Sequence, residues 1–381
     1  MTDPVVIIGS GLAGYMLAKE LRKLDEQVPL TIITSSDGSF YSKPLLSTAL
    51  AQKKDATALV TSPAEVMAEQ LKAEILTHTT VEKIDTQRKE VLIGDRAIKY
   101  RDCVLACGSY PIDPPWEGTG VQEIFSVNDL AAYGHFREAL TGKSKVAIIG
   151  AGLVGCEFAN DMAVSGIDVH VIAKEPFPLH DLLTSEIGSV FASKLEKEGV
   201  TWHLEKCVQA VNKEGDQFSI AMDDGSELVV DVVLSAIGIY PNTALAEGAG
   251  IQLDKAIVVD EFLKTSVEHV YALGDCAQIK GALLQYLAPL LQSSRALAAT
   301  LAGQQTQVKF PAMPVAVKTT LCPLVVAPPT EAEKLEWKVM GEEADYQALC
   351  YGDAGEFIGF ILSGNMTRER GRLQRELPSL M

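Results

Sequence analysis

The sequence predicts an α/β protein that contains one βαβ arrangement twice, followed by a small C-terminal α+β domain. Two observations predict the repeat. An apolar strand-like run leads into a glycine-rich turn at residues 5–14 and again at residues 146–155, and each turn continues into a stretch with helical apolar spacing. The third observation is a change of texture near residue 310, after which short apolar runs alternate with prolines. A chain of 381 residues is long enough for three such domains.

The two glycine turns read GSGLAG and GAGLVG, and both match the pattern G-x-G-x-x-G. In a Rossmann-like unit the first glycine makes a tight turn, the second lets the backbone approach a pyrophosphate, and the third lets the helix pack closely on the strand. The start of the helix then offers free N–H groups to the phosphates. We therefore expect two dinucleotide sites, formed by Gly9, Ser10, Gly11, Leu12 and Gly14 in the first unit and by Gly150, Gly152, Leu153, Val154 and Gly155 in the second.

A second strand is expected after each helix, at residues 30–34 and 169–173. An acidic residue usually ends this strand and accepts hydrogen bonds from the adenosine ribose. The first unit has Thr34 and Ser35 there, so that hydroxyl groups or the displaced Asp37 would have to serve. The second unit has Lys174 and then Glu175. Glu175 favours NAD, whereas Lys174 would suit the 2′-phosphate of NADP; we expect NAD and leave NADP open.

The two units also resemble each other in a later apolar run. Residues 103–107 and 232–236 are apolar, as in buried parallel strands, and each run is followed by a glycine and then a proline. The long apolar stretch 283–303 contains Gln285, Pro289 and Arg295, so we expect a buried helix rather than a membrane span. Beyond residue 310 we expect short strands at 315–318, 324–327, 346–350 and 357–361.

Composition limits the partners and the chemistry. A net charge of −17 argues against general binding of nucleic acid, since phosphate binding requires clustered Lys and Arg. The seven cysteines form no C-x-x-C pair and the histidines follow no metal spacing, which predicts no metal site and reduced, mostly buried thiols. No basic leader precedes the first strand, so a cytoplasmic protein without membrane contact is expected.

These motifs resemble the two-dinucleotide flavoprotein reductases, the glutathione-reductase-like family of FAD-dependent pyridine nucleotide reductases. The resemblance rests on both glycine turns, on Ala-Cys-Gly at 106–108 and Ala-Ile-Gly at 236–238, and on Tyr-Ala-Leu-Gly-Asp at 271–275. It implies FAD in the first unit, with Asp275 on the ribityl chain, and NADH in the second. It also implies an FAD domain of residues 1–115 and 240–310, an NAD(P) domain of residues 116–239 and a C-terminal domain of residues 311–381. Further implied cofactor contacts are Pro44, Val81, Ala106, Gly108, Gly238 and Gly274.

The branch of the family is indicated by residues 41–47, where disulfide reductases carry a redox cysteine pair and this chain has Lys43 and Pro44. Without a thiol beside the flavin, electrons must leave the flavin directly. Residues 41–47 and 314–326 are similar to the rubredoxin-reducing branch. That resemblance implies that the partner is rubredoxin or a similar small iron carrier. It also implies that this carrier passes the electrons on to a hydroxylase, such as one of alkane oxidation. A ferredoxin reductase, an NADH oxidase and a dinucleotide-sensing interaction flavoprotein are the alternatives.

Three charged residues are singled out for chemistry. We expect Lys43 near the flavin N5, paired with Glu157 of the second glycine-turn helix, so that the pair orders hydride transfer. An ordinary first-turn glutamate is the alternative for Glu157. Lys318 is a candidate cation for the reduced flavin near N1 and O2, or else a solvated edge-strand lysine. Arginines between 368 and 375 are a candidate docking patch for an acidic carrier, or else a solvated helix face.

Overall fold

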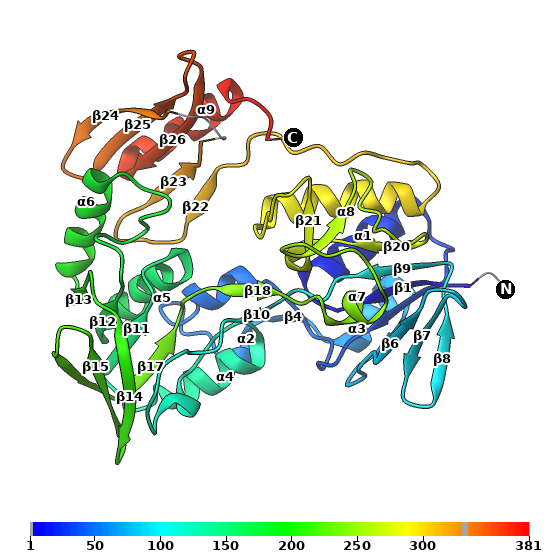
Figure 1. Ribbon diagram of the computed structural model, residues 1–381, viewed down its shortest axis with the longest axis horizontal. Helices are drawn as coiled ribbons and strands as arrows, with labels where there is room; N and C mark the ends of the chain where they lie inside the picture. The colour runs from blue at the N-terminus through cyan, green and yellow to red at the C-terminus, as the bar shows by residue number, and fades with distance from the viewer. Residues whose placement is uncertain (1–2, 330–333, 381) are drawn as a thin grey trace. The chain divides into compact units, whose positions relative to one another are not determined.

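The computed structural model describes residues 3–329 and 334–380, which form two compact units. The first unit consists of residues 1–43, 60–110 and 239–310, and the second of residues 44–59, 111–238 and 311–381. The chain therefore passes repeatedly from one unit to the other (Figure 1). One of these passages lies within β10 (Ser109–Pro111) and another directly before β18 (Ile239–Pro241), and these two strands pair with each other.

A parallel five-stranded sheet forms the centre of the first unit. Its strands run in the order β20 (Val270–Ala272), β9 (Asp102–Leu105), β1 (Val5–Ile8), β2 (Leu30–Ile33) and β5 (Glu74–Leu76). The strand β1 lies in the middle and is buried throughout, as expected for a parallel sheet covered on both faces. The helices α1 (Leu12–Leu24) and α8 (Leu287–Leu301) lie side by side (Figure 1). Pro289 stands in the first turn of α8, where a missing N–H costs nothing.

Smaller elements complete the first unit. They are β3 (Phe40–Tyr41) with β4 (Val60–Ser62), α3 (Ala64–Leu71), the antiparallel strands β6 (Lys83–Asp85), β7 (Glu90–Ile93) and β8 (Arg96–Lys99), α7 (Ala244–Gly248), β19 (Ile257–Val259) with β21 (Ala277–Ile279), and the 3-10 turn η3 (Gly274–Cys276). The 3-10 helix η1 (Lys43–Thr48) starts at the last residue of this part of the unit.

A second parallel sheet organises the second unit, in the order β13 (Val200–His203), β12 (Asp168–Ile172), β11 (Lys145–Ile149) and β17 (Val232–Ser235). The helix α5 (Leu153–Val164) follows β11 as α1 follows β1, which confirms the predicted repeat. Around this sheet lie α2 (Ala56–Leu59), η2 (Val121–Glu123), α4 (Leu130–Ala139), α6 (Ser185–Glu196) and the antiparallel strands β14 (Val208–Glu214), β15 (Gln217–Met222) and β16 (Glu227–Val230).

The C-terminal part of the second unit is an antiparallel sheet. Its order is β22 (Val315–Val317), β23 (Leu324–Ala327), β26 (Phe357–Ser363), β25 (Asp345–Tyr351) and β24 (Glu336–Glu342), followed by η4 (Gly364–Glu369) and α9 (Arg370–Glu376). The small antiparallel domain predicted from the sequence is present, with β24 as a strand that the sequence had not indicated.

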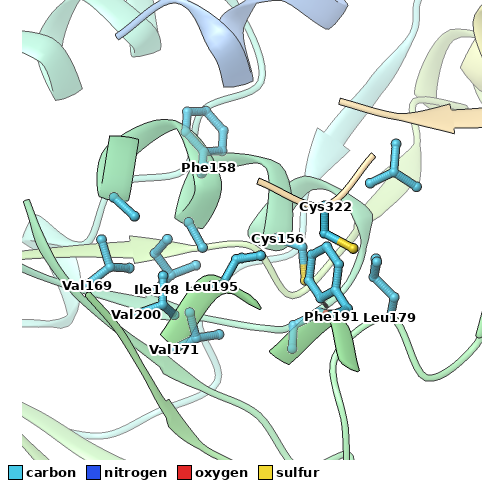
Figure 2. Close-up of a cluster of buried hydrophobic side chains, with 14 of the residues drawn as sticks. Ile148, Cys156, Phe158, Val169, Val171, Leu179, Phe191, Leu195, Val200 and Cys322 are labelled. Carbon is cyan, nitrogen blue, oxygen red and sulfur yellow. Dashed lines mark hydrogen bonds between the residues drawn. The ribbon is translucent and has the colours of Figure 1, made fainter. Parts of the chain in front are cut away.

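One hydrophobic core joins this C-terminal sheet to the parallel sheet of the second unit. Alternate residues of β11 enter different clusters, so that Ile148 contributes to this core and Ile149 to the opposite face, which β14–β16 cover. Figure 2 shows Cys322 of the C-terminal part in the same cluster as Cys156 of α5 and Phe191 of α6. The C-terminal part is therefore packed into the second unit through buried apolar contacts.

Candidate functional site

The two glycine turns have the same geometry. Gly9 has φ of +116° and Gly150 has φ of +110°, a region that side chains rarely enter, and a Cβ on either would lie within 2.5 Å of a carbonyl oxygen on a neighbouring strand end. A Cβ on Gly14 would lie 2.0 Å from the carbonyl oxygen of Gly9. The same 2.0 Å separates a Cβ on Gly155 from the carbonyl oxygen of Gly150. Each turn thus packs its helix against its strand as closely as backbone atoms allow.

The middle glycine of each turn faces open space. A Cβ on Gly11 or Gly152 meets nothing within 4 Å, and each of these glycines caps the N-terminus of its helix without a side-chain hydrogen bond. No acidic side chain stands in the first turn of α1 or α5. Both helix starts therefore present N–H groups and a positive dipole end to an open cradle, which fits the pyrophosphate of a dinucleotide.

A cluster of hydroxyl groups lies where the first unit lacks its acidic residue. Ser10 Oγ donates to Thr34 Oγ1 at 2.9 Å, and the hydroxyl of Ser36 lies 3.0 Å from that of Thr34. The carboxylate of Asp37 instead accepts hydrogen bonds from the backbone N–H and the hydroxyl of Ser39. Of the two alternatives left by the sequence, the hydroxyl groups converge at the strand end. Ser36 was not predicted, although it belongs to the same hydroxyl-rich run as Thr34.

At the matching position of the second unit, Lys174 is exposed and Glu175 is half-buried. The backbone carbonyl of Glu175 accepts a hydrogen bond from the N–H of Glu205 at 3.2 Å, which fixes the chain at this point. Among the described residues, neither Lys174 nor Glu175 forms an ion pair through its side chain. Both remain available to a nucleotide, so the expectation of NAD over NADP stays a prediction.

Lys43 and Asp275 meet in the first unit. Lys43 Nζ lies 3.8 Å from Asp275 Oδ2, and that oxygen also accepts a hydrogen bond from Ser109 Oγ at 3.0 Å. Gln285 donates to the backbone carbonyl of Asp275 at 3.1 Å. Ser109 and Gln285 were not among the predicted site residues, although Ser109 directly follows Gly108, which was predicted.

Glu157 and Lys318 meet in the second unit. Glu157, on α5, is 2% exposed, and its carboxylate forms an ion pair with Lys318 Nζ. It also accepts hydrogen bonds from the backbone N–H of Lys318 at 3.0 Å and from the hydroxyl of Ser47 at 2.7 Å. Lys318 Nζ in turn donates to Ser47 Oγ at 3.0 Å. Glu157 is thus a buried anion with its own cation, rather than a solvated first-turn glutamate.

This arrangement bears on the two lysines singled out from the sequence. Glu157 takes a lysine from the C-terminal part as partner, and Lys43 takes Asp275. The predicted pairing of Lys43 with Glu157 and the predicted place of Lys318 beside the flavin N1 and O2 both stay predictions. Lys318 is not a solvated edge-strand lysine, because its ammonium group lies on a buried carboxylate.

The remaining predicted contacts border the two cradles. Leu12 and Leu153 are the first residues of α1 and α5, and Val154 follows with 47% of its surface exposed. Other predicted contacts lie at strand ends, in turns or beside them: Pro44 in η1, Val81 before β6, Ala106 and Gly108 after β9, Gly238 before β18, and Gly274 in η3.

The thiols nearest to the first cradle are not set up for redox exchange. Cys107 follows β9 and Cys276 ends η3, and all seven cysteines are unpaired. Burial raises the pKa of Cys107 well above its ordinary value and that of Cys276 to about 11. A thiol with a raised pKa forms little thiolate, which is the reactive species. These cysteines therefore do not supply a dithiol relay.

None of the helices in residues 3–329 and 334–380 is long and apolar enough to span a membrane. Within the same residues, no group of three or more His, Cys, Asp or Glu side chains is arranged to hold a metal ion.

Comparisons with known proteins follow the division at residue 306. Residues 3–306 match the pyridine nucleotide-disulphide oxidoreductase family, and residues 307–377 match the rubredoxin binding C-terminal domain. Among curated proteins, the chain is 43% identical over 379 residues to a rubredoxin-NAD(+) reductase of Alcanivorax borkumensis, covering 99% of both chains. It is 37% identical to a nitric oxide reductase FlRd-NAD(+) reductase of Vibrio vulnificus over 377 residues, covering 99% of this chain and 98% of that one.

Solved structures agree on the fold. A ferredoxin reductase of the CYP199A2 system from Rhodopseudomonas palustris superposes with a TM-score of 0.89 at 25% identity, over 99% of this chain and 96% of that one. The reductase in the covalent putidaredoxin reductase–putidaredoxin complex superposes with a TM-score of 0.88 at 24% identity, over 99% and 94%.

Proposed function

The chain belongs to the pyridine nucleotide-disulphide oxidoreductase family, and from that premise we propose that it is a flavoenzyme that transfers electrons from NADH through FAD to rubredoxin. The family predicted from the sequence motifs is confirmed. The observation that carries the proposal is the pair of equivalent glycine turns. In each turn the first and third glycines pack against backbone atoms, and the middle glycine faces open space. A rubredoxin-binding match over residues 307–377 supports the carrier.

The residues of the first unit fit FAD. The open side of Gly11 and the free start of α1 suit its pyrophosphate, and the hydroxyls of Ser10 and Thr34 suit its adenosine ribose. Asp275, held by Ser109, suits the hydroxyls of the ribityl chain. When bound, FAD supplies the redox chemistry, since a flavin takes up a hydride from NADH and releases the electrons singly.

The residues of the second unit fit the nicotinamide dinucleotide. Gly152 and the start of α5 suit its pyrophosphate, and Glu175 suits its ribose. Glu157 lies in the second turn of the same helix and is held in place by Lys318 and Ser47. These contacts fix the position of its buried, paired carboxylate, which suits a role in orienting the bound nucleotide.

We also propose three domains: an FAD domain of residues 1–115 and 240–310, an NAD(P) domain of residues 116–239, and a C-terminal domain of residues 311–381. The first compact unit, with residues 60–110 and 239–310, supports the discontinuous FAD domain. The second unit also takes residues 44–59, which lie inside that FAD domain in sequence.

A cytoplasmic location is proposed as well, supported by seven unpaired cysteines and testable by cell fractionation.

Anaerobic reduction of the purified yellow protein tests the function. NADH should bleach the flavin, and rubredoxin should reoxidise the reduced protein faster than ferredoxin or air in stopped-flow measurements, with NADPH as the control donor. A protein that cannot be made yellow with FAD, or that neither nucleotide bleaches, would rule the proposal out.

The relatives of 37% identity from Vibrio vulnificus favour one alternative acceptor, the FlRd component of a nitric oxide reductase. Faster reoxidation by ferredoxin or by oxygen would instead indicate a ferredoxin reductase or an NADH oxidase. Sustained turnover with an artificial one-electron acceptor, at about ten per second, would exclude a purely sensing flavoprotein.

A further inference from the structure

The helix α5 carries three buried polar residues that bind two separate segments of the second unit. Glu157 is 2% exposed, and Asn160 and Asp161 are each 3% exposed. Asn160 accepts a hydrogen bond from the N–H of Leu321 at 3.0 Å and donates to the hydroxyl of Thr320 at 3.2 Å. Glu157 and Asn160 therefore hold the C-terminal segment around residues 318–321, whereas Asp161 contacts a different part of the chain.

Asp161 binds the segment of residues 44–59. Its Oδ2 accepts a hydrogen bond from the N–H of Leu50 at 2.8 Å, and its Oδ1 accepts one from the N–H of Ala51 at 3.0 Å. The residue stands in the last turn of α5, where the helix dipole disfavours a negative charge. Burial raises the pKa of Asp161 to about 6. A carboxylate buried at this end of a helix lowers the stability of the fold. Its hydrogen bonds to Leu50 and Ala51 therefore indicate that it serves to hold the segment of residues 44–59.

The segment of residues 44–59 starts directly after Lys43 and contains Ser47. Ser47 donates to Glu157 at 2.7 Å and accepts from Lys318, and so completes the buried ion pair. Further along, the carbonyl of Lys54 accepts a hydrogen bond from the hydroxyl of Tyr133 on α4. Between these two points, the two backbone bonds to Asp161 attach the segment to α5.

We propose that Asp161 is a positioning residue: its ionised carboxylate holds residues 44–59 against α5 and thereby keeps Ser47 on Glu157 and Lys318. The proposal rests on the proposed function for the meaning of that ion pair. Both oxygens of the carboxylate are used as acceptors, one for each N–H. Protonation turns one of the two oxygens into a hydroxyl, which accepts a hydrogen bond more weakly than a carboxylate oxygen does, so that the bond from one of the two N–H groups weakens and the segment loosens.

The titratable and charged groups around Asp161 come from three elements. Arg137 and Tyr133 face it from α4, and the positive charge of Arg137 lowers the pKa of Asp161, opposing the effect of burial. The bound segment carries Lys53, Lys54 and Asp55 within four residues of Ala51 in sequence, and Glu157 stands one turn before Asp161 on α5. Burial remains the largest cause, so we expect Asp161 to ionise between about pH 5 and pH 7.

Flavin reduction in the holoenzyme provides the first test. We expect the limiting rate of anaerobic bleaching by NADH to fall in the wild type as the pH decreases through about 6, because a misplaced reacting group slows transfer. In Asp161→Asn the rate should be roughly tenfold lower at neutral pH and flat across that range. The apparent Kd for NADH should be unchanged, since Asp161 lies at the opposite end of α5 from the pyrophosphate cradle.

A matched control is available in the same unit. Asp231 Oδ2 also accepts hydrogen bonds from two successive backbone N–H groups, those of Ser144 and Lys145, at 3.1 and 3.0 Å. Asp231→Asn should keep the wild-type rate and pH profile. If Asp161→Asn retained the wild-type rate and pH profile as well, or if both variants lost them equally, the positioning role would be refuted.

Hydrogen exchange gives a second readout that requires no electron transfer. Peptides within residues 44–59 should exchange faster in Asp161→Asn than in the wild type, and peptides from the first unit should not change. In the wild type alone, their protection should decrease below about pH 6 after correction for intrinsic exchange, so that the test stands even if the variant fails to fold. Unchanged protection overturns the proposal. A wild type that NADH cannot bleach but that shows the expected exchange would refute the proposed function only.

Discussion

Among single residues, the buried ion pair of Glu157 and Lys318 has the most direct energetic consequence. A carboxylate that is 2% exposed depends on its cation, because removing one partner of a buried pair leaves an uncompensated charge. Its other contacts, the hydroxyl of Ser47 and the backbone N–H of Lys318, are neutral donors and replace that charge only in part.

Lys318→Met should therefore lower the free energy of unfolding by about 3 kcal/mol, measured by urea denaturation of the holoenzyme. Lys338→Met is the control, because Lys338 is an exposed lysine of the same C-terminal sheet, 3.8 Å from Glu336 and 4.7 Å from the ring centroid of Tyr351, and should cost less than about 1 kcal/mol. Adding Glu157→Gln to Lys318→Met should recover much of the loss. Equal stability of the single and the double variant would contradict this account.

Asp161 predicts a pH dependence of stability with a definite sign. Its folded pKa, about 6, lies above the value of about 3.8 expected in the unfolded chain. Compared with the unfolded chain, the folded state binds the proton more tightly, because burial outweighs the two hydrogen bonds, and the group contributes stability that is fully present below about pH 4 and is lost as the pH rises through 6. Within the folded state, protonation weakens only the two hydrogen bonds to residues 44–59, which themselves lower the pKa. The stability of wild type relative to Asp161→Asn should fall by about 3 kcal/mol over this range in urea melts, whereas a constant difference would contradict the raised pKa.

The individual residues were predictable to different degrees. Glu157, Lys43 and Lys318 were each identified from the sequence, because a charged residue next to a glycine turn or in a family motif stands out. Their partners were not, since residues 157 and 318 come together only through the packing of the C-terminal sheet on α5. Asp161 gave no signal, because a polar residue in a helix is usually solvated.

At the level of elements, the three glycines of each turn have different surroundings. The first and third are tightly packed against backbone atoms, and the middle one faces open space. Gly155 lies where a Cβ would come within 2.0 Å of a backbone carbonyl oxygen, and Gly152 lies where a Cβ meets nothing. The two positions therefore separate folding from nucleotide binding in a single motif.

Gly155→Ala should lower the free energy of unfolding by at least about 2 kcal/mol, because neither the helix nor the strand can move without losing core contacts. Gly152→Ala should leave the melting temperature unchanged but raise the Kd for NADH about tenfold, since the added methyl group occupies the space of the pyrophosphate. Thermal melts and NADH titrations of both variants check this pair. The reverse pattern would show that the cradle does not hold the nucleotide.

Elements with strong apolar periodicity were predicted to within one or two residues. The strand expected at 30–34 is β2, at Leu30–Ile33, and that at 169–173 is β12, at Asp168–Ile172. The strand β24 was missed because its residues are mostly exposed and include glutamate, lysine and glycine, so that no buried face marks it in the sequence. The strands β14–β16 do bury alternate residues, but they were missed because polar and charged residues, as in Asn212-Lys213-Glu214 of β14, obscure the alternation.

For the molecule as a whole, the distribution of charge concerns its partner. The chain carries a net charge of −17, yet residues 368–375 contain four arginines. Arg372 forms ion pairs with Glu369 and Glu376 at 2.9 Å, whereas Arg368 and Arg375 are exposed. This local positive charge lies within the region that matches the rubredoxin binding domain.

Replacing Arg368 and Arg375 together by glutamine should slow reoxidation of the reduced protein by an acidic rubredoxin about threefold to tenfold at low ionic strength, and less at high salt. Flavin reduction by NADH should be unaffected. Arg372→Gln is the control, because its charge is already neutralised by two glutamates. If the control slows rubredoxin reduction as much as the double variant, docking does not use this arginine patch.

The order of the strands in the first sheet has a consequence for biosynthesis. The strand β20 pairs with β9, but the ribosome makes it only after the whole parallel sheet of the other unit, a delay on the order of ten seconds. Until then β9 presents an unpaired edge, while β11, β12, β13 and β17 are already complete. All strands of the second parallel sheet are thus available to pair before β9 has its last neighbour, which leaves the edge of β9 open to non-native pairing during synthesis.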